Sequence, residues 1–284
     1  MSSVYIFGYG SILDKSSRAR GDFSSSERDE KPGEQDAVLV SLLPSARLRR
    51  SWNYRCESGF TAVGLEKAPK GCEAVVCGVL FAVNARALAA FDKRERGYHR
   101  LRLNPKHLRV RSRSKALGDD GLASIEAKVH DDILCARELE SRKGGGSGEG
   151  GRQEEDEGKG EGEGAIFYTY VPDCPQSADH EFPICQTYLD VILRGCLDWG
   201  GEELAREWVQ TTRGWCESLS VFLLSSLQAS STTQSALFRS QSLCLPPSAP
   251  CIGSGREYCS AFLAQRRTIL QKAVATPPLL PDHR

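Results

Sequence analysis

A short turn near the start of the chain has the residue types needed to hold an anionic group. The apolar run Val4-Tyr5-Ile6-Phe7 predicts a buried strand, and Gly8-Tyr9-Gly10-Ser11 follows it directly. Glycines on both sides of an aromatic residue let a ligand approach the main chain, whose N–H groups can bind an anion. An ordinary tight turn is an equally good interpretation. A phosphate-binding P-loop is excluded, because no Gly-Lys-Ser/Thr follows.

A second stretch places a carboxylate at the end of a predicted helix. In Phe91-Asp92-Lys93-Arg94-Glu95-Arg96-Gly97-Tyr98, the helix ends near Glu95 and a strand begins near Tyr98. A carboxylate between these two elements can be fixed at the rim of a cavity. Taken alone, one glutamate among lysines and arginines is more often a solvated charge.

Other polar residues give weaker signals. Tyr168 and Tyr170 lie on one face of a predicted strand, where they can line a cavity or pack in the core. Arg47 and Arg50 can meet a substrate carboxylate, although solvated strand charges are the better expectation. The histidines lie far apart without metal-ligand spacing: His99, His107, His130, His180 and His283. No cysteine has a partner for nucleophilic work, and we expect neither a metal nor a cofactor.

Apolar periodicity divides the chain into strands and helices that could position these residues. Strands are expected at 4–7, 37–43, 46–54, 60–65, 73–83, 98–103 and 166–171, and residues 107–112 are expected to continue the strand at 98–103. Asn84 is a suitable N-cap for a helix at 85–95, and Gly97 stands where a glycine often ends a helix. Two amphipathic helices are expected at 184–197 and 202–213, separated by Gly200-Gly201. A short polar helix or loop at 14–23, a surface loop at 24–36 and a weakly patterned helix at 119–142 complete the expectation.

Two segments differ in composition from the rest. Residues 143–164 are mostly Gly, Glu and other polar residues, which predicts a disordered insertion in a loop. Residues 216–284 are rich in Ser, Leu, Gln and Pro without a sustained period, which predicts a poorly ordered tail or an artefact of the gene model. We therefore expect one domain over residues 1–215.

Composition indicates a cytoplasmic protein without a nucleic-acid or membrane partner. The formal net charge is zero, and 40% of the residues are hydrophobic. The eleven cysteines are scattered without a CxxC pair, which favours free thiols in a reducing compartment over a disulfide framework. A strand at the very start leaves no room for a signal peptide, and no apolar run is long enough to span a bilayer.

Together, the two motifs resemble those of the γ-glutamylcyclotransferase family, whose superfamily includes the ChaC-type proteins. Its signatures are a Tyr-Gly-Ser-Asn/Leu turn and an Asp-x-x-Glu-x-Gly-Tyr segment, and both occur here in order. Further pieces of similar sequence are Arg50-Ser51-Trp52-Asn53, Phe60-Thr61-Ala62-Val63-Gly64, Gly78-Val79-Leu80-Phe81, Gln186-Thr187-Tyr188-Leu189-Asp190 and Gly214-Trp215. The resemblance extends from Val4 to Trp215, apart from the two inserts. It implies an α+β fold in which a small mixed β-barrel is flanked by helices.

The resemblance also implies a reaction, the release of 5-oxoproline from a γ-glutamyl amine, a dipeptide or glutathione. The α-amine of the substrate attacks its own γ-carbonyl, so the protein needs no nucleophile. What the step needs is a base that takes a proton from the ammonium and returns it to the leaving nitrogen, which is the role expected of Glu95. Such a base works near neutrality if desolvation raises its pKa. Tyr98 is expected to pack beneath it.

The remaining expected site residues would bind and fold the substrate. Backbone N–H groups of Tyr9, Gly10, Ser11 and Ile12 would hold the γ-glutamyl carboxylate or stabilise the developing oxyanion. Tyr170 is expected to line the same cavity. The sequence departs from the family pattern at Ile12, in the Gly/Glu insert and in the tail after Trp215, which lacks the residues expected to close the domain.

Two other functions fit the same residues. A catalytically idle member would bind a small acidic metabolite as a regulatory or interaction module, and an exposed Glu95 pointing away from the turn would favour it. Cleavage of a γ-glutamylamine at a lysine side chain would need a cavity open at one end for a long leaving group. The leaving group and the oligomeric state do not follow from the sequence.

Overall fold

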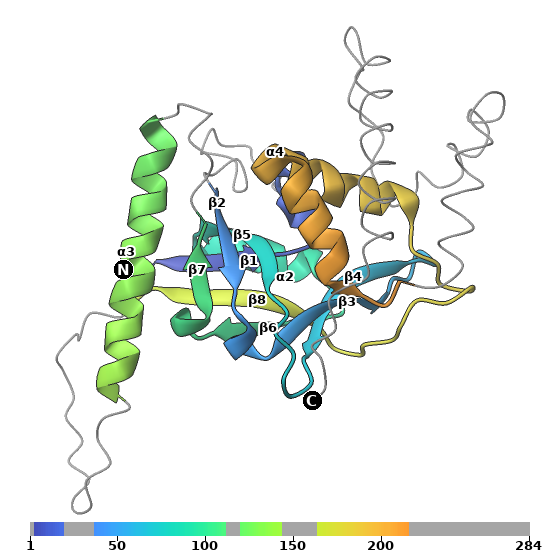
Figure 1. Ribbon diagram of the computed structural model, residues 1–284, viewed down its shortest axis with the longest axis horizontal. Helices are drawn as coiled ribbons and strands as arrows, with labels where there is room; N and C mark the ends of the chain where they lie inside the picture. The colour runs from blue at the N-terminus through green and yellow to red at the C-terminus, as the bar shows by residue number, and fades with distance from the viewer. Residues whose placement is uncertain (1–2, 20–36, 112–119, 144–163, 216–284) are drawn as a thin grey trace, which may run out of the picture.

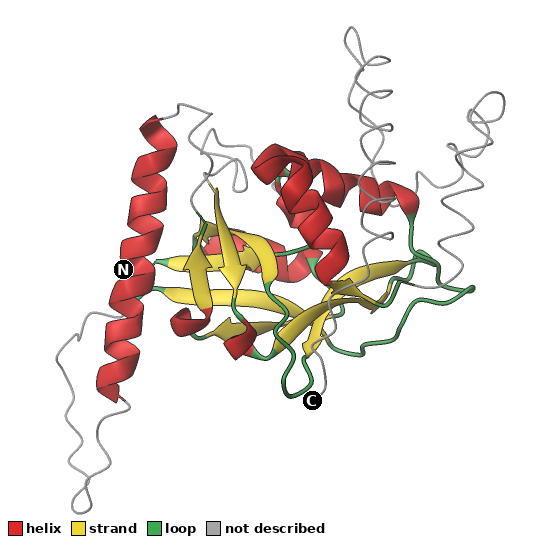
Figure 2. Ribbon diagram, in the orientation of Figure 1, coloured by secondary structure: helices red, strands yellow, loops and turns green. Residues whose placement is uncertain are grey.

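The predicted strands form two sheets, drawn in yellow in Figure 2. The computed structural model describes residues 3–19, 37–111, 120–143 and 164–215, so the predictions for 24–36, for most of the Gly/Glu insert and for the tail lie outside the described residues. The larger sheet contains, in spatial order, β6 (Tyr98–Leu103), β8 (Ile166–Pro172), β1 (Val4–Gly8), β5 (Val76–Val83), β2 (Ala37–Leu42) and β7 (Leu108–Val110). The smaller sheet contains β4 (Thr61–Lys67), β3 (Leu48–Arg55) and β9 (Thr212–Arg213).

Strand β1 lies in the middle of the larger sheet and ends at the predicted anion-binding turn. It pairs in parallel with β8 and antiparallel with β5. Its residues Tyr5, Ile6 and Phe7 are at most 2% exposed, as expected for a continuous apolar run covered on both faces. A central strand of this kind fixes the position of the turn that follows it.

Helices cover the sheets on different sides (Figure 1). Helix α4 (Gln186–Thr211) packs against β5 and the 3₁₀ turn η1 (Ser11–Leu13), while α3 (Asp120–Lys143) packs against β2, β7 and the 3₁₀ turn η3 (Pro105–His107). Helix α2 (Ala85–Arg94) follows β5, and the short helix α1 (Lys15–Arg18) follows η1. The other 3₁₀ turn, η2 (Pro44–Ala46), precedes β3. None of the described helices is both long and apolar enough to cross a membrane.

Local sequence signals predicted the helix boundaries well. The Asn84 side chain accepts a hydrogen bond from the amide of Ala87 at 2.8 Å, so it is the N-cap of α2. The expected break between two helices is a kink inside α4, where Gly201 has a φ of +63°. The helix expected at 119–142 is confirmed as α3.

Some of the predictions need correction. The prediction of a mixed α+β fold is confirmed, but the barrel is not, because β6 and β7 are the edge strands of the larger sheet and the described strands form no closed barrel. Residues 107–112 do not continue β6. Instead, η3 turns the chain and β7 pairs with β2 at the opposite edge of the sheet.

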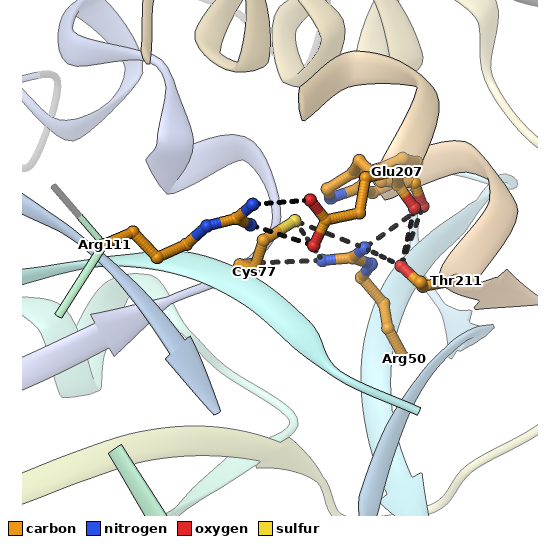
Figure 3. Close-up of polar contacts among 6 residues, drawn as sticks. Arg50, Cys77, Arg111, Glu207 and Thr211 are labelled. Carbon is orange, nitrogen blue, oxygen red and sulfur yellow. Dashed lines mark hydrogen bonds and ion pairs between the residues drawn. The ribbon is translucent and has the colours of Figure 1, made fainter. Parts of the chain in front are cut away.

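The predicted solvated charge at Arg50 is also wrong. Arg50 is 0% exposed, and its guanidinium donates to the carbonyl oxygens of Cys77 on β5 and Trp208 on α4 and to the Oγ1 atoms of Thr211 and Thr212. Figure 3 shows Arg50 between Cys77 and Thr211, with the ion pair of Glu207 and Arg111 beside it. This arginine joins the smaller sheet to the larger sheet and to α4.

Candidate active site

The turn after β1 lies at the wall of a cavity. The 3₁₀ turn η1 is closed by hydrogen bonds from the amides of Leu13 and Asp14 to the carbonyl oxygens of Gly10 and Ser11, at 3.0 and 3.1 Å. Among the described residues, the amide N–H groups of Gly10, Ser11 and Ile12 have no acceptor, as is general for the first residues of a helical turn. They are therefore available to an anionic ligand.

Glu95 lies at the C-terminal end of α2, where the chain turns into β6. Its amide bonds the Phe91 carbonyl oxygen at 2.8 Å, and its carbonyl oxygen accepts the amide of Tyr98 at 3.1 Å. Gly97 completes the turn with a φ of +82°, a conformation that favours glycine. The carboxylate is thereby held on a short, hydrogen-bonded segment between a helix and a strand.

The cavity brings the two motifs together. It is lined by Phe7, Gly8, Tyr9, Gly10, Ser11, Ile12, Val63, Glu95, Tyr98, Tyr170 and Tyr188, which include every site residue predicted from the sequence. Its volume of about 30 Å³ accommodates one or two waters. A substrate would therefore place only a small polar end inside unless the lining side chains move.

Desolvation dominates the electrostatics of Glu95. The side chain is 18% exposed, and burial raises the pKa of the carboxyl above its ordinary value. The guanidinium of Arg94, with Nε 3.2 Å from Oε1 of Glu95, lowers the pKa but only partly offsets this effect. A carboxylate with a raised pKa can both accept and return a proton near neutral pH.

The tyrosines around Glu95 are neutral hydrogen-bonding groups. Tyr9 donates to the carbonyl oxygen of Tyr170 at 2.7 Å, and Tyr98 donates to that of Val63 at 3.1 Å. The hydroxyl of Tyr170 donates to Oδ1 of Asp92 at 2.9 Å. Burial raises the pKa of the Tyr9, Tyr98 and Tyr170 phenols well above the ordinary value. Glu95 is therefore the lining residue that can carry a negative charge near neutral pH.

Other candidates from the sequence lie elsewhere. Tyr168 does not line the cavity; the Arg100 guanidinium lies 5.2 Å from its ring centre. Arg47 lines a separate open hollow with Lys70 and neighbouring residues. Among the described residues, no group of three or more His, Cys, Asp or Glu side chains could hold a metal ion.

Tyr188 and Val63 line the cavity but were not predicted as site residues. Tyr188 belongs to the apolar face of α4, where its spacing indicates core packing. An added Cβ at Gly10 would lie 2.9 Å from Cγ1 of Val63 and 3.2 Å from the Tyr188 hydroxyl, so both side chains pack against the turn. Tertiary contact brings them there. Apolar periodicity could not have identified them; the one sequence signal for them is that both lie in segments that carry the family resemblance.

Comparisons with known proteins give a weak likeness. No family model matches the chain, and no curated protein matches it significantly. One similar solved structure is a gamma-glutamyl cyclotransferase, with 12% identity, coverage of 78% of this chain and 98% of that chain, and a TM-score of 0.41. YkqA from Bacillus subtilis has 14% identity and a TM-score of 0.38, and the match covers 73% of this chain and 53% of that chain. An uncharacterized protein from Homo sapiens has 13% identity and a TM-score of 0.41, and the match covers 78% of this chain and 98% of that chain. A likeness at this level does not establish a family.

Proposed function

We propose that this protein is a γ-glutamylcyclotransferase-like enzyme that releases 5-oxoproline from a γ-glutamyl compound. The observation that carries the proposal is the shared cavity of Glu95 and the Gly8–Ile12 turn. These are the two motifs on which the sequence resemblance rests, and they come from distant parts of the chain. The reaction needs a base beside an anion-binding backbone, and the cavity supplies both.

In the proposed reaction, Glu95 carries protons, one at a time, from the attacking nitrogen to the leaving nitrogen. The unprotonated carboxylate takes a proton from the substrate ammonium, and the freed α-amine attacks the γ-carbonyl. The new C–N bond closes a five-membered lactam as the original γ-amide C–N bond breaks. The protonated Glu95 gives its proton to the leaving nitrogen as that bond breaks. The carboxylate then takes the second proton that the new lactam nitrogen must lose and passes it to the released amine, which departs as an ammonium. The raised pKa of Glu95 suits these steps, because a strongly acidic carboxylate would accept the proton poorly.

The turn would hold the substrate in the folded shape that the attack requires. The N–H groups of Gly10, Ser11 and Ile12 would bind the α-carboxylate, which leaves the α-amine close to Glu95. The neutral tyrosines enclose this end of the substrate and exclude water. The γ-carbonyl and the leaving group would then extend out of the small cavity toward solvent.

An idle protein that binds a small acidic metabolite is the alternative. That function would be favoured by a Glu95 pointing away from the turn, whereas the carboxylate lines the same cavity as the turn. A carboxylate beside an anion site would also repel an acidic ligand that lacks an ammonium group. The geometry therefore supports catalysis over simple anion binding.

The test is an assay for 5-oxoproline with the full-length protein and a panel of γ-glutamyl amines, dipeptides and glutathione. We expect wild type to release 5-oxoproline from at least one of them. Glu95→Gln keeps the shape of the side chain but cannot accept the proton, so its kcat should fall by about 10²-fold or more.

Glu73→Gln is the matched control, because it makes the same chemical change at an exposed position before β5. It should retain wild-type activity. A folded wild type that releases no 5-oxoproline from any compound of the panel would refute the proposal, as would full activity in Glu95→Gln.

A further inference from the structure

In the turn after β1, the carbonyl oxygens of four consecutive residues, Tyr9 to Ile12, each accept a hydrogen bond. The donors are Nε1 of Trp208 to Tyr9 at 3.0 Å, the amide of Leu13 to Gly10 at 3.0 Å, the amide of Asp14 to Ser11 at 3.1 Å, and Nη1 of Arg18 to Ile12 at 2.8 Å. In a trans peptide the N–H points opposite to the C=O of the same unit. The donors that hold the carbonyls of Tyr9, Gly10 and Ser11 therefore direct the amide N–H groups of the next three residues the other way.

The Tyr9–Gly10 peptide differs from its neighbours because a distant side chain holds it. The next two carbonyls accept bonds from within the 3₁₀ turn, but the Tyr9 carbonyl depends on Trp208, which lies 199 residues further along the chain on α4. Glycine tolerates φ values of either sign, so a peptide that precedes Gly10 can turn over at low cost. Without its hydrogen bond to Trp208, this peptide could present its oxygen to the cavity in place of its N–H.

Trp208 is itself held in one orientation. It is 0% exposed, and the Arg50 guanidinium lies 4.4 Å from its ring centre while donating to its carbonyl oxygen at 3.1 Å. The rings of Trp52 and Trp215 pack edge-on against it at 5.9 and 6.3 Å. The indole N–H therefore has a fixed direction, which is what a support for a binding group requires.

We propose that Trp208 is a positioning residue that holds the Tyr9 carbonyl and so aims the Gly10 N–H at the α-carboxylate of the substrate. The inference rests on the proposed function, which supplies the γ-glutamyl group that carries this carboxylate. Trp208 does not line the cavity, so it acts through the peptide and makes no contact with the substrate.

Trp199 offers a matched control on the same helix. Its Nε1 donates to the carbonyl oxygen of Leu13 at 2.9 Å, and this oxygen also accepts Nη1 of Arg18 at 3.0 Å. The N–H of the same peptide unit belongs to Asp14. It donates to the Ser11 carbonyl oxygen within the turn, and Asp14 does not line the cavity. Loss of the Trp199 N–H should leave the three amides at the cavity unchanged.

The test compares Trp208→Phe and Trp199→Phe in the full-length protein, using the γ-glutamyl compound that wild type turns over. We expect Trp208→Phe to raise KM about tenfold with kcat close to wild type, because it weakens a hydrogen bond to a charged group of the bound substrate. Trp199→Phe should leave KM unchanged. An unchanged KM in folded Trp208→Phe, or an equal rise in Trp199→Phe, would overturn the proposal.

A second replacement removes the risk that Trp208→Phe fails to fold. Benzothienylalanine at position 208 keeps the size of the indole and substitutes sulfur for the N–H, so packing is preserved and only the donor is lost. It should raise KM as Trp208→Phe does, with a melting temperature close to that of wild type. A wild-type KM in this protein would refute the positioning role even if Trp208→Phe is unfolded.

A binding measurement separates this inference from the proposed reaction. L-Glutamate, which has the same α-carboxylate and α-ammonium groups, is titrated into ¹⁵N-labelled wild type and the benzothienylalanine protein. We expect it to shift the Gly10 amide resonance in wild type and to shift it much less in the replacement. If these shifts are seen but the protein releases no 5-oxoproline, the proposed reaction is refuted and the positioning role of Trp208 stands. Equal shifts in the two proteins, or no shift in wild type, would overturn the inference.

Discussion

At the scale of a single residue, the burial that makes Glu95 a suitable base also lowers the stability of the protein at neutral pH. The Glu95 carboxylate loses hydration on folding, and the Arg94 guanidinium only partly compensates, so the pKa rises. A raised pKa means that the native state binds the proton more tightly than the unfolded state does. The protonated form therefore contributes stability that is complete below the unfolded pKa and is lost as pH rises through the native pKa.

Glu95→Gln should consequently be more stable than wild type at neutral pH. Glutamine is uncharged, so the variant avoids the desolvation cost of the ionised carboxylate. We expect the difference in free energy of unfolding, measured with urea, to be near zero below the ordinary glutamate pKa of about 4.3 and to grow above it. Glu73→Gln, at an exposed site, should show no such growth. A pH-independent difference for Glu95→Gln would mean that Glu95 is not desolvated in the native state.

At the scale of elements, the turn between α2 and β6 determines where Glu95 lies. Gly97 has a φ of +82°, and a Cβ there would lie 2.2 Å from the hydroxyl of Tyr54 and 2.8 Å from its Cζ. Tyr54 cannot move aside easily, because its ring packs 4.3 Å from that of Tyr98 and its hydroxyl bonds the Arg96 carbonyl oxygen at 2.7 Å. A side chain at Gly97 would therefore displace the segment that carries Glu95.

Gly97→Ala should destabilise the protein and lower its activity, and Gly59→Ala is the matched control. Gly59 has a φ of +80° in an exposed turn, with no atom within 4 Å of an added Cβ. Both variants incur backbone strain, but only Gly97→Ala adds the collision with Tyr54. We expect its free energy of unfolding to fall by about 1–3 kcal/mol more than that of Gly59→Ala, with a loss of 5-oxoproline release. Equal effects of the two variants on unfolding and activity would show that Tyr54 yields without moving Glu95.

These elements also show what a sequence can predict. Three features depend on only a few neighbouring residues, so the local sequence was sufficient to predict them: the N-cap at Asn84, the turn at Gly97 and the break at Gly200-Gly201. The pairing of β7 with β2 and the place of Tyr188 at the cavity depend on contacts between distant segments. Local periodicity carries no information on such contacts, and both were missed.

At the scale of the whole molecule, the two arginines at the start of β3 also show what local sequence does not predict. Arg49 and Arg50 are adjacent, so their side chains point to opposite faces of the strand. The pattern of two charged residues does not tell which of them faces the core. The structure buries Arg50 among neutral acceptors from β5, α4 and β9, while Arg49 pairs with Glu66 at 2.6 Å in a partly exposed site.

Arg50 thus connects three parts of the molecule, the smaller sheet, the larger sheet and α4. Its guanidinium satisfies the Cys77 carbonyl oxygen of the larger sheet and the Trp208 carbonyl oxygen of α4 (Figure 3). Through Trp208, it also supports the orientation of the turn at the cavity. The buried charge is tolerated because each nitrogen of the guanidinium has an acceptor.

Arg50→Met should therefore cost far more stability than Arg49→Met. Methionine fills much of the same space but removes the donor to the Cys77 carbonyl oxygen and to the Thr211 and Thr212 hydroxyls, at about 1–3 kcal/mol for each buried acceptor left unpaired. The Trp208 carbonyl oxygen keeps the Thr212 hydroxyl as a donor at 2.6 Å. We expect the free energy of unfolding, from urea denaturation at pH 7, to fall by at least about 3 kcal/mol for Arg50→Met. For Arg49→Met the fall should stay below about 1 kcal/mol, since its ion pair is accessible to solvent. Similar losses in the two variants would mean that Arg50 contributes no more to joining the sheets and α4 than a surface charge does.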